Sequence, residues 1–245
     1  MGLSRSVLSP RCTTDHLLAA LCHLLADPAW DVAHFNQLRP DSPLLLVLQQ
    51  LESATVSPYP GDLCSRCPAV IIADLPRKVR ADVLYHRNFA TSRGSLELCL
   101  ANEHDWRPAF DLLVRFHSRR WEQAGESGVL ADPAVLAWHR EALPLLQAHG
   151  LLRLSTLRLA DESIAALYSL IDPPSRPSRT QYFYLMGFST DLAEFRPGTL
   201  LTALAIERAA AEGVQTIDML RGEETYKQFW HVKDVPTFGF AVRRA

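Results

Sequence analysis

The sequence is poor in lysine and has no long apolar run. Lys78, Lys227 and Lys233 are the only lysines among 25 basic residues, so the positive charge is almost all arginine. The longest dense apolar run, Pro43 to Leu48, is far shorter than the ~20 residues that a membrane-spanning helix needs. Residues 1–11 contain no sustained apolar stretch, which argues against a signal peptide. We therefore expect a cytoplasmic protein that does not insert into a membrane.

The net charge and the cysteine content argue against two further classes of function, nucleic-acid coating and metal binding. A net charge of -2 and a pI near 6.5 argue against a protein that mainly coats nucleic acid, so we expect no DNA partner. The 5 cysteines are an odd number, which fits reduced thiols in the cytoplasm. Cys64 and Cys67 have the spacing of half a zinc site, but no second pair lies at a matching distance. We interpret them as incidental and expect no metal.

With 245 residues and 48% hydrophobic content, the chain can form one large domain or two small ones with a real core. Apolar periodicity and turn residues predict helices and strands in alternation over the first hundred residues. The predicted elements are a helix from Thr13 or Thr14 to before Pro28, a strand over 30–38, a helix over 44–51, a break at 58–61, a strand over 69–73, a helix over 75–93 and a strand over 95–100.

The remaining chain begins with two predicted helices, Asp105 to about Trp121 and Pro133 to Gly150. Three strands with short connections follow, which predicts an antiparallel meander. They cover 152–159, 163–171 and 181–188, and after them come a helix over 198–213, a strand over 216–220, a short helix over 223–230 and a strand over 237–243.

One segment concentrates reactive residue types. Residues 218–230 read DMLRGEETYKQFW, so a strand ending in Asp218 and a helix carrying Glu224, Tyr226 and Lys227 would bring an acid, a phenol and an amine together. Such a set is suited to proton transfer. In the alternative interpretation, Asp218 and Glu224 brace the turn at Gly222, and Tyr226 and Trp230 pack on one helical face.

Several motifs in the same order resemble one protein family. They are FHSRRW at 116–121, the strands around Ile164, YFYLMGFS at 182–189, RPGTLLTALAIERAAAEG at 196–213, and DMLRGEETYKQFW. Together they resemble the CelD-like acetyltransferases of cellulose and exopolysaccharide synthesis, within the GNAT superfamily and similar to the FemAB aminoacyltransferases. The resemblance implies an α/β (α+β) fold with a GNAT-like mixed sheet flanked by helices. It also implies an abbreviated N-terminal GNAT-like half over 1–104 and a C-terminal acyltransferase domain over 105–245.

The resemblance further implies that the turn before the 198–213 helix holds coenzyme A, with acetyl-CoA or another acyl-CoA as co-substrate. Unpaired amides at a helix start attract a pyrophosphate, which makes Arg196, Gly198, Thr199 and Leu200 candidate cofactor-binding residues. Leu201 stands where the usual motif has a small residue. A Pro-Gly turn before a helix also occurs in proteins without a ligand there.

The resemblance implies that Tyr226, which lies where GNAT enzymes commonly have a tyrosine, is the acid that protonates the departing thiolate, and Glu224 or Asp218 is the candidate base by position. His117 is a further catalytic candidate, although a histidine on an apolar helix face is more often structural. Lys227, Trp230 and Trp121 are candidates for substrate binding. Arg119 and Arg120, beside Trp121, are interpreted as solvated.

The function expected first is direct transfer of an acyl group from coenzyme A to an amine or hydroxyl of a small molecule or an envelope or polysaccharide precursor. Aminoacyl transfer from tRNA, as in the FemAB relatives, is the alternative enzymatic function. A noncatalytic partner in polysaccharide assembly is the alternative outside enzymes. A second copy of the chain, forming a homodimer, is a further candidate partner.

Overall fold

The computed structural model describes residues 13–51, 54–102, 104–222 and 224–244. The chain divides into two compact units. The central unit comprises Arg66–Leu220 and Thr225–Val232, and the terminal unit comprises the described parts of Met1–Ser65, Arg221–Glu224 and Lys233–Ala245. The domain boundary that we predicted between residues 104 and 105 falls inside the central unit and stays a prediction.

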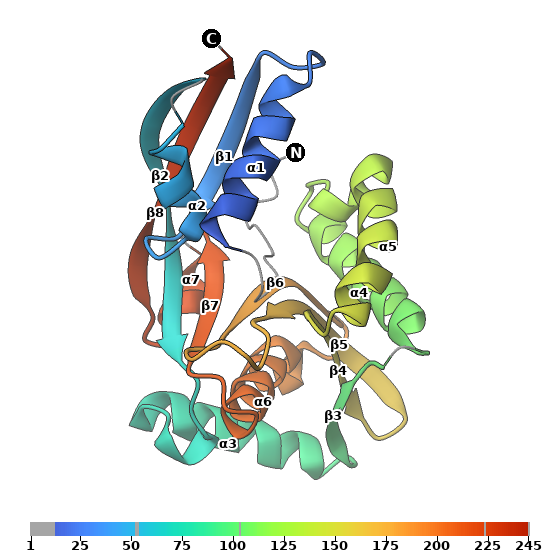
Figure 1. Cartoon of the computed structure of the whole chain (residues 1–245). Coiled ribbons are helices and arrows are strands. Elements are labelled where there is room, and N and C mark those ends of the chain that lie inside the picture. The colour runs from blue at the N-terminus through green and yellow to red at the C-terminus, as the bar shows by residue number, and fades with distance from the viewer. Residues whose placement is uncertain (1–12, 52–53, 103, 223, 245) are drawn as a thin grey trace. The chain divides into compact units, whose positions relative to one another are not determined.

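The terminal unit is a small sheet with two helices. Its elements are α1 Thr14–Ala26, β1 Val32–Leu38, α2 Pro43–Leu48, most of β2 Ala54–Pro68, and β8 Lys233–Arg244 (Figure 1). The strand order is β1-β8-β2, with β1 antiparallel to β8. The Thr13 side chain accepts a hydrogen bond from the His16 amide, which caps α1. Leu21, Val47 and Val242 meet in a buried apolar cluster, so the two helices cover one side of these strands.

Two predictions in this stretch of chain are wrong. The break predicted at 58–61 lies inside β2, because Gly61 is a point of close approach and not a turn: a Cβ there would collide with Thr237 of β8. The strand predicted over 69–73 is a connection that leads into the short 3-10 helix η1, Ile72–Asp74. Residues far away in the sequence hold both segments: Gly61 fits against Thr237, and the Ile72 amide donates to the Glu207 carboxylate at 3.1 Å. Local composition does not encode such contacts.

The central unit confirms the predicted alternation from residue 75 onward, and the α/β class with a mixed sheet flanked by helices is confirmed. Its strands are β3 Leu96–Leu100, β4 Leu152–Leu159, β5 Glu162–Ile171, β6 Thr180–Phe188 and β7 Thr216–Arg221. Its helices are α3 Arg77–Thr91, α4 Trp106–Gln123, α5 Pro133–Ala148, α6 Pro197–Ala211 and α7 Thr225–Gln228, with 3-10 turns η2 Val129–Ala131 and η3 Ala193–Phe195. The helix predicted over 223–230 is thus only one turn long, and Glu223 lies outside the described residues.

The strands β3 to β6 pair antiparallel in sequence order, as predicted for the meander, whereas β7 runs parallel to β6. The parallel pairing covers only three positions, Thr180 to Tyr182 against Thr216 to Asp218. Among the described residues, the rest of β6 has no strand partner on this side. A bulge also interrupts β6, because Tyr168 and Ser169 pair with Leu185 and Phe183 and leave Tyr184 as the extra residue.

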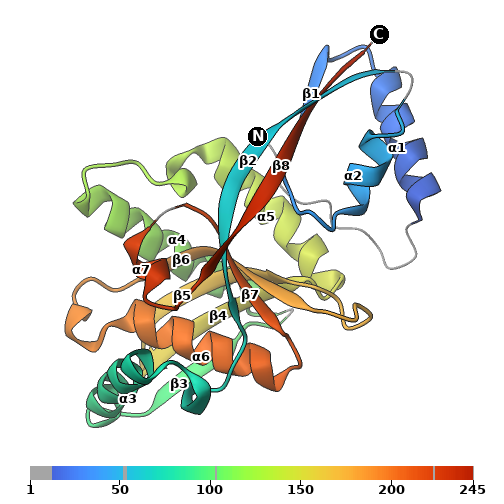
Figure 2. The same ribbon diagram turned by 90° about the vertical axis from the view of Figure 1, so that its left-hand side faces the viewer.

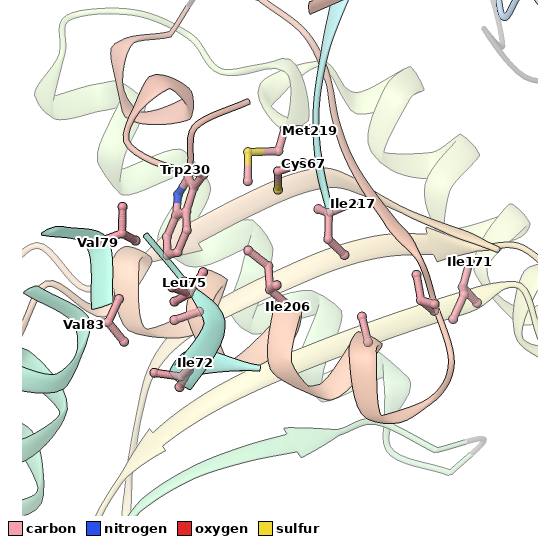
Figure 3. Packing of buried hydrophobic residues seen from close by; sticks show 13 residues of the cluster. Cys67, Ile72, Leu75, Val79, Val83, Ile171, Ile206, Ile217, Met219 and Trp230 are labelled. Atoms are coloured by element: carbon pink, nitrogen blue, oxygen red, sulfur yellow. The ribbon is translucent and has the colours of Figure 1, made fainter. Parts of the chain in front are cut away.

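Helices cover both faces of the central sheet. Figure 2 shows α4 and α5 on one side of the strands and α6 and α3 on the other, and the element contacts agree. On the α6 side, Ile206, Ile217 and Trp230 belong to a buried cluster that also includes Val79 and Val83 of α3 (Figure 3). On the α4 side, Phe110 and Leu154 belong to a second cluster. Because apolar residues of α6 are buried against the sheet, they hold the N-terminus of this helix at a set position beside β6.

Candidate functional site

A cavity of about 470 Å³ opens in the central unit at the N-terminus of α6. This volume is in the range of small-molecule sites. Its walls come from α4, β6, η3, α6, α7 and the residues just after α7, and they are mostly apolar or aromatic. The lining residues are Arg120, Met186, Phe188, Ala193, Arg196, Pro197, Gly198, Thr199, Thr202, Thr225, Tyr226, Phe229 and Trp230.

The start of α6 offers free amides to this cavity. Arg196 is the N-cap residue, with a left-handed φ of 49° and no capping hydrogen bond from its side chain. Pro197 has no N–H, and the first backbone bond of the helix runs from Leu200 N to Arg196 O. The amides of Gly198 and Thr199 therefore have no backbone acceptor among the described residues. These amides and the helix dipole favour an anion at this end of the cavity.

The charge of the cavity agrees with that preference. Arg120 and Arg196 both contribute to its walls, and none of the described lining residues carries a carboxylate. The Nη1 atom of Arg196 lies 3.1 Å from a carboxylate oxygen of Asp82 on α3, which holds this side chain at the rim. Two guanidinium groups, of which only Arg196 pairs with a carboxylate among the described residues, make the cavity a receptor for negative charge.

Five of the predicted site residues line this one cavity: Arg196, Gly198, Thr199, Tyr226 and Trp230. Tyr226 on α7 is 43% exposed, so its phenol is accessible to a ligand. Trp230 is buried and takes part in the apolar cluster behind the cavity. Leu200, predicted to bind the cofactor, points into the core and is 0% exposed. The structure thus brings the predicted cofactor turn and the predicted acid together.

Asp218 and Lys227, from the same sequence segment, do not line the cavity. Asp218 is fully buried, pairs with Arg66 Nε at 3.0 Å and accepts a hydrogen bond from the Leu220 amide at 2.8 Å. Lys227 is also buried, and its Nζ donates to Leu220 O at 3.3 Å. Both side chains brace the left-handed Leu220, which has a φ of 62°. Their predicted catalytic and substrate-binding roles stay predictions.

His117 and Trp121 form a pair one helical turn apart on α4. The indole Nε1 of Trp121 donates to His117 Nε2 at 3.0 Å, so the remaining proton of the neutral ring is on Nδ1. Burial and, to a smaller extent, the nearby Arg120 charge together lower the pKa of His117 to about 4. Neither residue lines the cavity. The geometry is that of a neutral histidine that orients a tryptophan, and the predicted catalytic role of His117 stays a prediction.

A second buried histidine, His139 on α5, lies among aromatic rings. Its ring centroid is 5.6 Å from that of Tyr168 and 5.5 Å from that of Tyr184. Burial lowers the pKa of His139 below its ordinary value, so this ring is neutral as well. Both histidines on the α4 and α5 side are therefore uncharged at neutral pH.

Glu224 belongs to the terminal unit. Its carboxylate folds back against Gly222, where φ is 110° and a Cβ would collide with it. This geometry is that of a turn which only glycine tolerates. The predicted role of Glu224 as a base stays a prediction.

Sequence reasoning missed several lining residues. Arg120 was interpreted as solvated; it is half-buried and also contributes to the cavity wall, which sequence reasoning did not predict. Met186 and Phe188 alternate along β6 on the α6 side, a period-two signal that YFYLMGFS already contained. Phe229 and Thr202 left no comparable signal, because only the packing of α6 and α7 brings them to the cavity.

Three further features of the described chain bear on function: its possible metal ligands, the Cys67 thiol and the apolar character of its helices. Among residues 13–51, 54–102, 104–222 and 224–244, no group of three His, Cys, Asp or Glu side chains is placed to hold a metal ion. Burial raises the pKa of the Cys67 thiol to about 12, so this cysteine is an unreactive thiol at neutral pH. Within the described chain, no helix combines the length and the apolar character that crossing a membrane requires.

Solved structures resemble this chain in fold. FemX aligns with a TM-score of 0.65 and 11% identity over 95% of this chain and 77% of FemX. The C-terminal domain of a putative lysylphosphatidylglycerol synthetase from Agrobacterium fabrum gives 0.60 and 14% over 95% and 73% of the two chains. L-PGS from Bacillus licheniformis gives 0.58 and 12% over 93% and 72%. At these identities the likeness concerns the fold alone.

Sequence comparison is more specific. No curated protein matches the chain. The model of the acetyltransferase (GNAT) domain family matches residues 77–228, which include α3, α4, β6, α6 and Tyr226. The narrower CelD-like assignment stays a prediction. Because the family match covers more than half of the chain, the protein belongs to the acetyltransferase (GNAT) domain family and is a GNAT-type acyltransferase.

Proposed function

We propose that the cavity of the central unit binds an acyl-CoA and that the protein transfers its acyl group directly to an amine or hydroxyl. One observation carries the proposal: a single cavity joins the free amides at the start of α6 to the phenol of Tyr226. The first feature suits the phosphates of the co-substrate and the second suits its departing thiolate. A site for both ends of one ligand supports acyl transfer from a thioester.

The unpaired part of β6 supports the same assignment. Beyond Tyr182 this strand has backbone N–H and C=O groups with no strand partner toward β7, among the described residues. An extended ligand with amide groups can bond to such an edge as another strand would. Met186 and Phe188 of β6 supply apolar contacts beside it. The pantetheine arm of coenzyme A, which carries two amides on a mostly apolar chain, fits this surface.

The transfer itself has a simple proton balance. The acceptor nitrogen or oxygen attacks the thioester carbonyl, its proton passes to a base, and the carbon–sulfur bond breaks as the thiolate leaves. We assign to Tyr226 the proton that neutralises the thiolate, because it is the exposed phenol of the cavity. The proton of the acceptor passes to water, and the predicted catalytic roles of Glu224, Asp218 and His117 stay predictions.

For the acceptor, we propose a small molecule or a precursor of an envelope polysaccharide, as the CelD-like resemblance implies. The alternative enzymatic function is aminoacyl transfer from tRNA. One observation favours it: α3 carries the exposed Arg77 and Lys78 and the half-buried Arg80 and Arg87, and it also provides Asp82, the partner of Arg196. Binding to RNA through such a surface weakens steeply with added salt. A noncatalytic role in polysaccharide assembly, a homodimer and a cytoplasmic location stay predictions.

Thermal stabilisation tests the proposal. Coenzyme A or acetyl-CoA at ~100 times its dissociation constant is expected to add about 2.7 kcal/mol to the stability of the folded protein. A panel of amines and hydroxyl compounds with acetyl-CoA tests turnover, read as release of free thiol. No stabilisation at saturating acetyl-CoA, together with no thiol release from any acceptor, would falsify the proposal. Strongly salt-dependent binding of aminoacyl-tRNA instead would favour the alternative.

A further inference from the structure

The anion-binding end of the cavity contains one group that the α6 turn does not provide. Arg120, in the last turn of α4, reaches the cavity wall from the other side of β6. Its guanidinium carbon lies 5.3 Å from the centroid of the Phe188 ring and 5.8 Å from that of Trp121. Phe188 in turn touches the α6 turn, since a Cβ at Gly198 would lie 3.1 Å from its ring. Arg120 and Gly198 thus flank the same side chain.

Among the described residues, Arg120 differs from Arg119 and Arg196 in having no carboxylate partner. Arg119 pairs with Asp191 at 2.9 Å, and Arg196 pairs with Asp82 at 3.1 Å. Among the described residues, Arg120 makes no ion pair with a carboxylate and interacts only with aromatic rings. Aromatic rings attract a cation without neutralising it, so its full charge remains directed at the cavity.

The position of Arg120 is also fixed in advance. The Trp121 ring beneath it is held by its hydrogen bond to His117. His117 is buried with a pKa of about 4, so it stays neutral and keeps this bond at physiological pH. Gly128 closes over the pair, because a Cβ there would collide with both rings. A cation that is already ordered loses little conformational entropy when an anion binds.

The α6 turn by itself provides little for a ligand with two phosphates. It offers the two amides of Gly198 and Thr199, while the charge of Arg196 is shared with Asp82. A diphosphate carries more negative charge than two amides compensate. A second, unpaired cation within reach of the same ligand is what such a group requires.

We propose that Arg120 is a second phosphate-binding residue of the cavity, which binds one phosphate of a diphosphate ligand whose other phosphate lies at the amides of Gly198 and Thr199. The inference rests on the proposed function in identifying this ligand as coenzyme A. In that case α4 supplies a charge that the short α6 turn lacks. The residue binds the ligand and takes no part in the bond rearrangement.

Binding measurements on Arg120→Gln, Arg120→Lys and the control Arg119→Gln test the inference. The probes are coenzyme A, pantetheine, which lacks every phosphate, and inorganic pyrophosphate. Arg120→Gln is expected to weaken binding of coenzyme A and of pyrophosphate about tenfold or more, the range for a lost hydrogen bond to a charged group, and to leave pantetheine binding unchanged. Arg120→Lys keeps the charge but loses the planar guanidinium, and its affinity for coenzyme A and pyrophosphate is expected to lie between those of the wild type and Arg120→Gln. Arg119→Gln is expected to bind all three probes like the wild type.

The outcomes separate this inference from the proposed function. If the wild type binds coenzyme A and Arg120→Gln binds it equally well, the role of Arg120 is wrong while the proposed function stands. If Arg120→Gln weakens pantetheine binding as much as coenzyme A binding, Arg120 acts on the apolar arm or on the fold, and the inference is also wrong. If the wild type binds pyrophosphate through Arg120 but not coenzyme A, the inference holds and the proposed function fails. If it binds neither, both are wrong.

Discussion

The segment over 218–230 contains two sets of polar and aromatic residues with opposite surroundings. Asp218 and Lys227 are 0% and 2% exposed and are held by the chain around Leu220, whereas Tyr226 is 43% exposed in a cavity wall. The same division separates His117, buried, from Arg120, three residues later in the cavity. Residues that are neighbours in sequence thus have different tasks: the buried ones fix the backbone and the cavity residues are available to a ligand.

The largest expected change in stability comes from substituting Asp218, one of the buried residues. Asp218→Ala leaves the Arg66 guanidinium without its carboxylate and the Leu220 amide without its acceptor. Removing one partner of a buried pair costs about 3–5 kcal/mol of unfolding free energy, measured by urea denaturation. The control Asp191→Ala breaks the exposed pair with Arg119, which is worth less than about 1 kcal/mol. A stable Asp218→Ala protein without turnover would instead make Asp218 the base.

Stability is also expected to depend on pH through His117. Its folded-state pKa of about 4 lies below the ordinary value of 6.5, because burial disfavours the charged ring. The stabilisation is therefore fully present above pH ~6.5 and is lost as the pH falls toward ~4, by an amount on the order of 3 kcal/mol. His139 acts in the same direction, since burial lowers its pKa too.

Urea denaturation of the wild type and of His117→Gln between pH 7.5 and 4.5 measures this dependence. The stability difference between the two proteins should shrink toward acid pH, and His149→Gln, which alters an exposed histidine, should follow the wild type. A difference that stays constant with pH contradicts the burial of an uncharged His117.

On the cavity side, Tyr226→Phe tests the proposed acid. Loss of a positioned proton donor is expected to lower kcat about 100-fold, which corresponds to ~2.7 kcal/mol of transition-state stabilisation. The KM for acyl-CoA should change little, since the ring remains. Tyr85→Phe is the matched control, because Tyr85 is 66% exposed on α3 and lies outside the cavity. Unchanged turnover in Tyr226→Phe would show that the acid is another group.

The smallest expected changes in stability come from substituting alanine for Gly187 and for Gly198. A Cβ at Gly187 would lie 2.7 Å from the backbone nitrogen of His117, so Gly187→Ala pushes α4 away from β6 and costs about 2 kcal/mol. A Cβ at Gly198 would lie 3.1 Å from the Phe188 ring, which can turn into the cavity. Gly198→Ala should thus change stability by less than about 1 kcal/mol and mainly weaken coenzyme A binding. Equal losses of stability in both variants would contradict the conclusion that β6 is tightly packed at Gly187 and faces open space near Gly198.

Much of the central unit could be predicted because its signals are local. Period-two apolar patterns predicted β4, β5 and β6, and Pro197 and Gly198 predicted where α6 begins. The same turn and Tyr226 were singled out from the sequence, and the structure places both on one cavity. Local rules were sufficient where an element is defined by its own side chains.

The wrong prediction at 58–61 and the missed role of Arg120 both involve contacts between distant parts of the chain. Pro58 and Gly61 looked like a break, but Gly61 fits closely against Thr237, far away in the sequence. Arg120 looked solvated, but Phe188 of β6 gives it a position in the cavity wall. In each case the deciding contact joins residues that local patterns cannot connect.

The sequence by itself determined the order of helices and strands in the central unit from residue 75 onward, the turn at Arg196 and the chemical types available in residues 218–230. Only the tertiary structure decided which of those groups face a ligand. Burial withdraws Asp218, Lys227 and His117 into the protein, while β6 beyond Tyr182 has no strand partner toward β7 among the described residues. The reason is physical: exposure and charge compensation depend on the packing of helices against a sheet, and that packing is set by the whole chain.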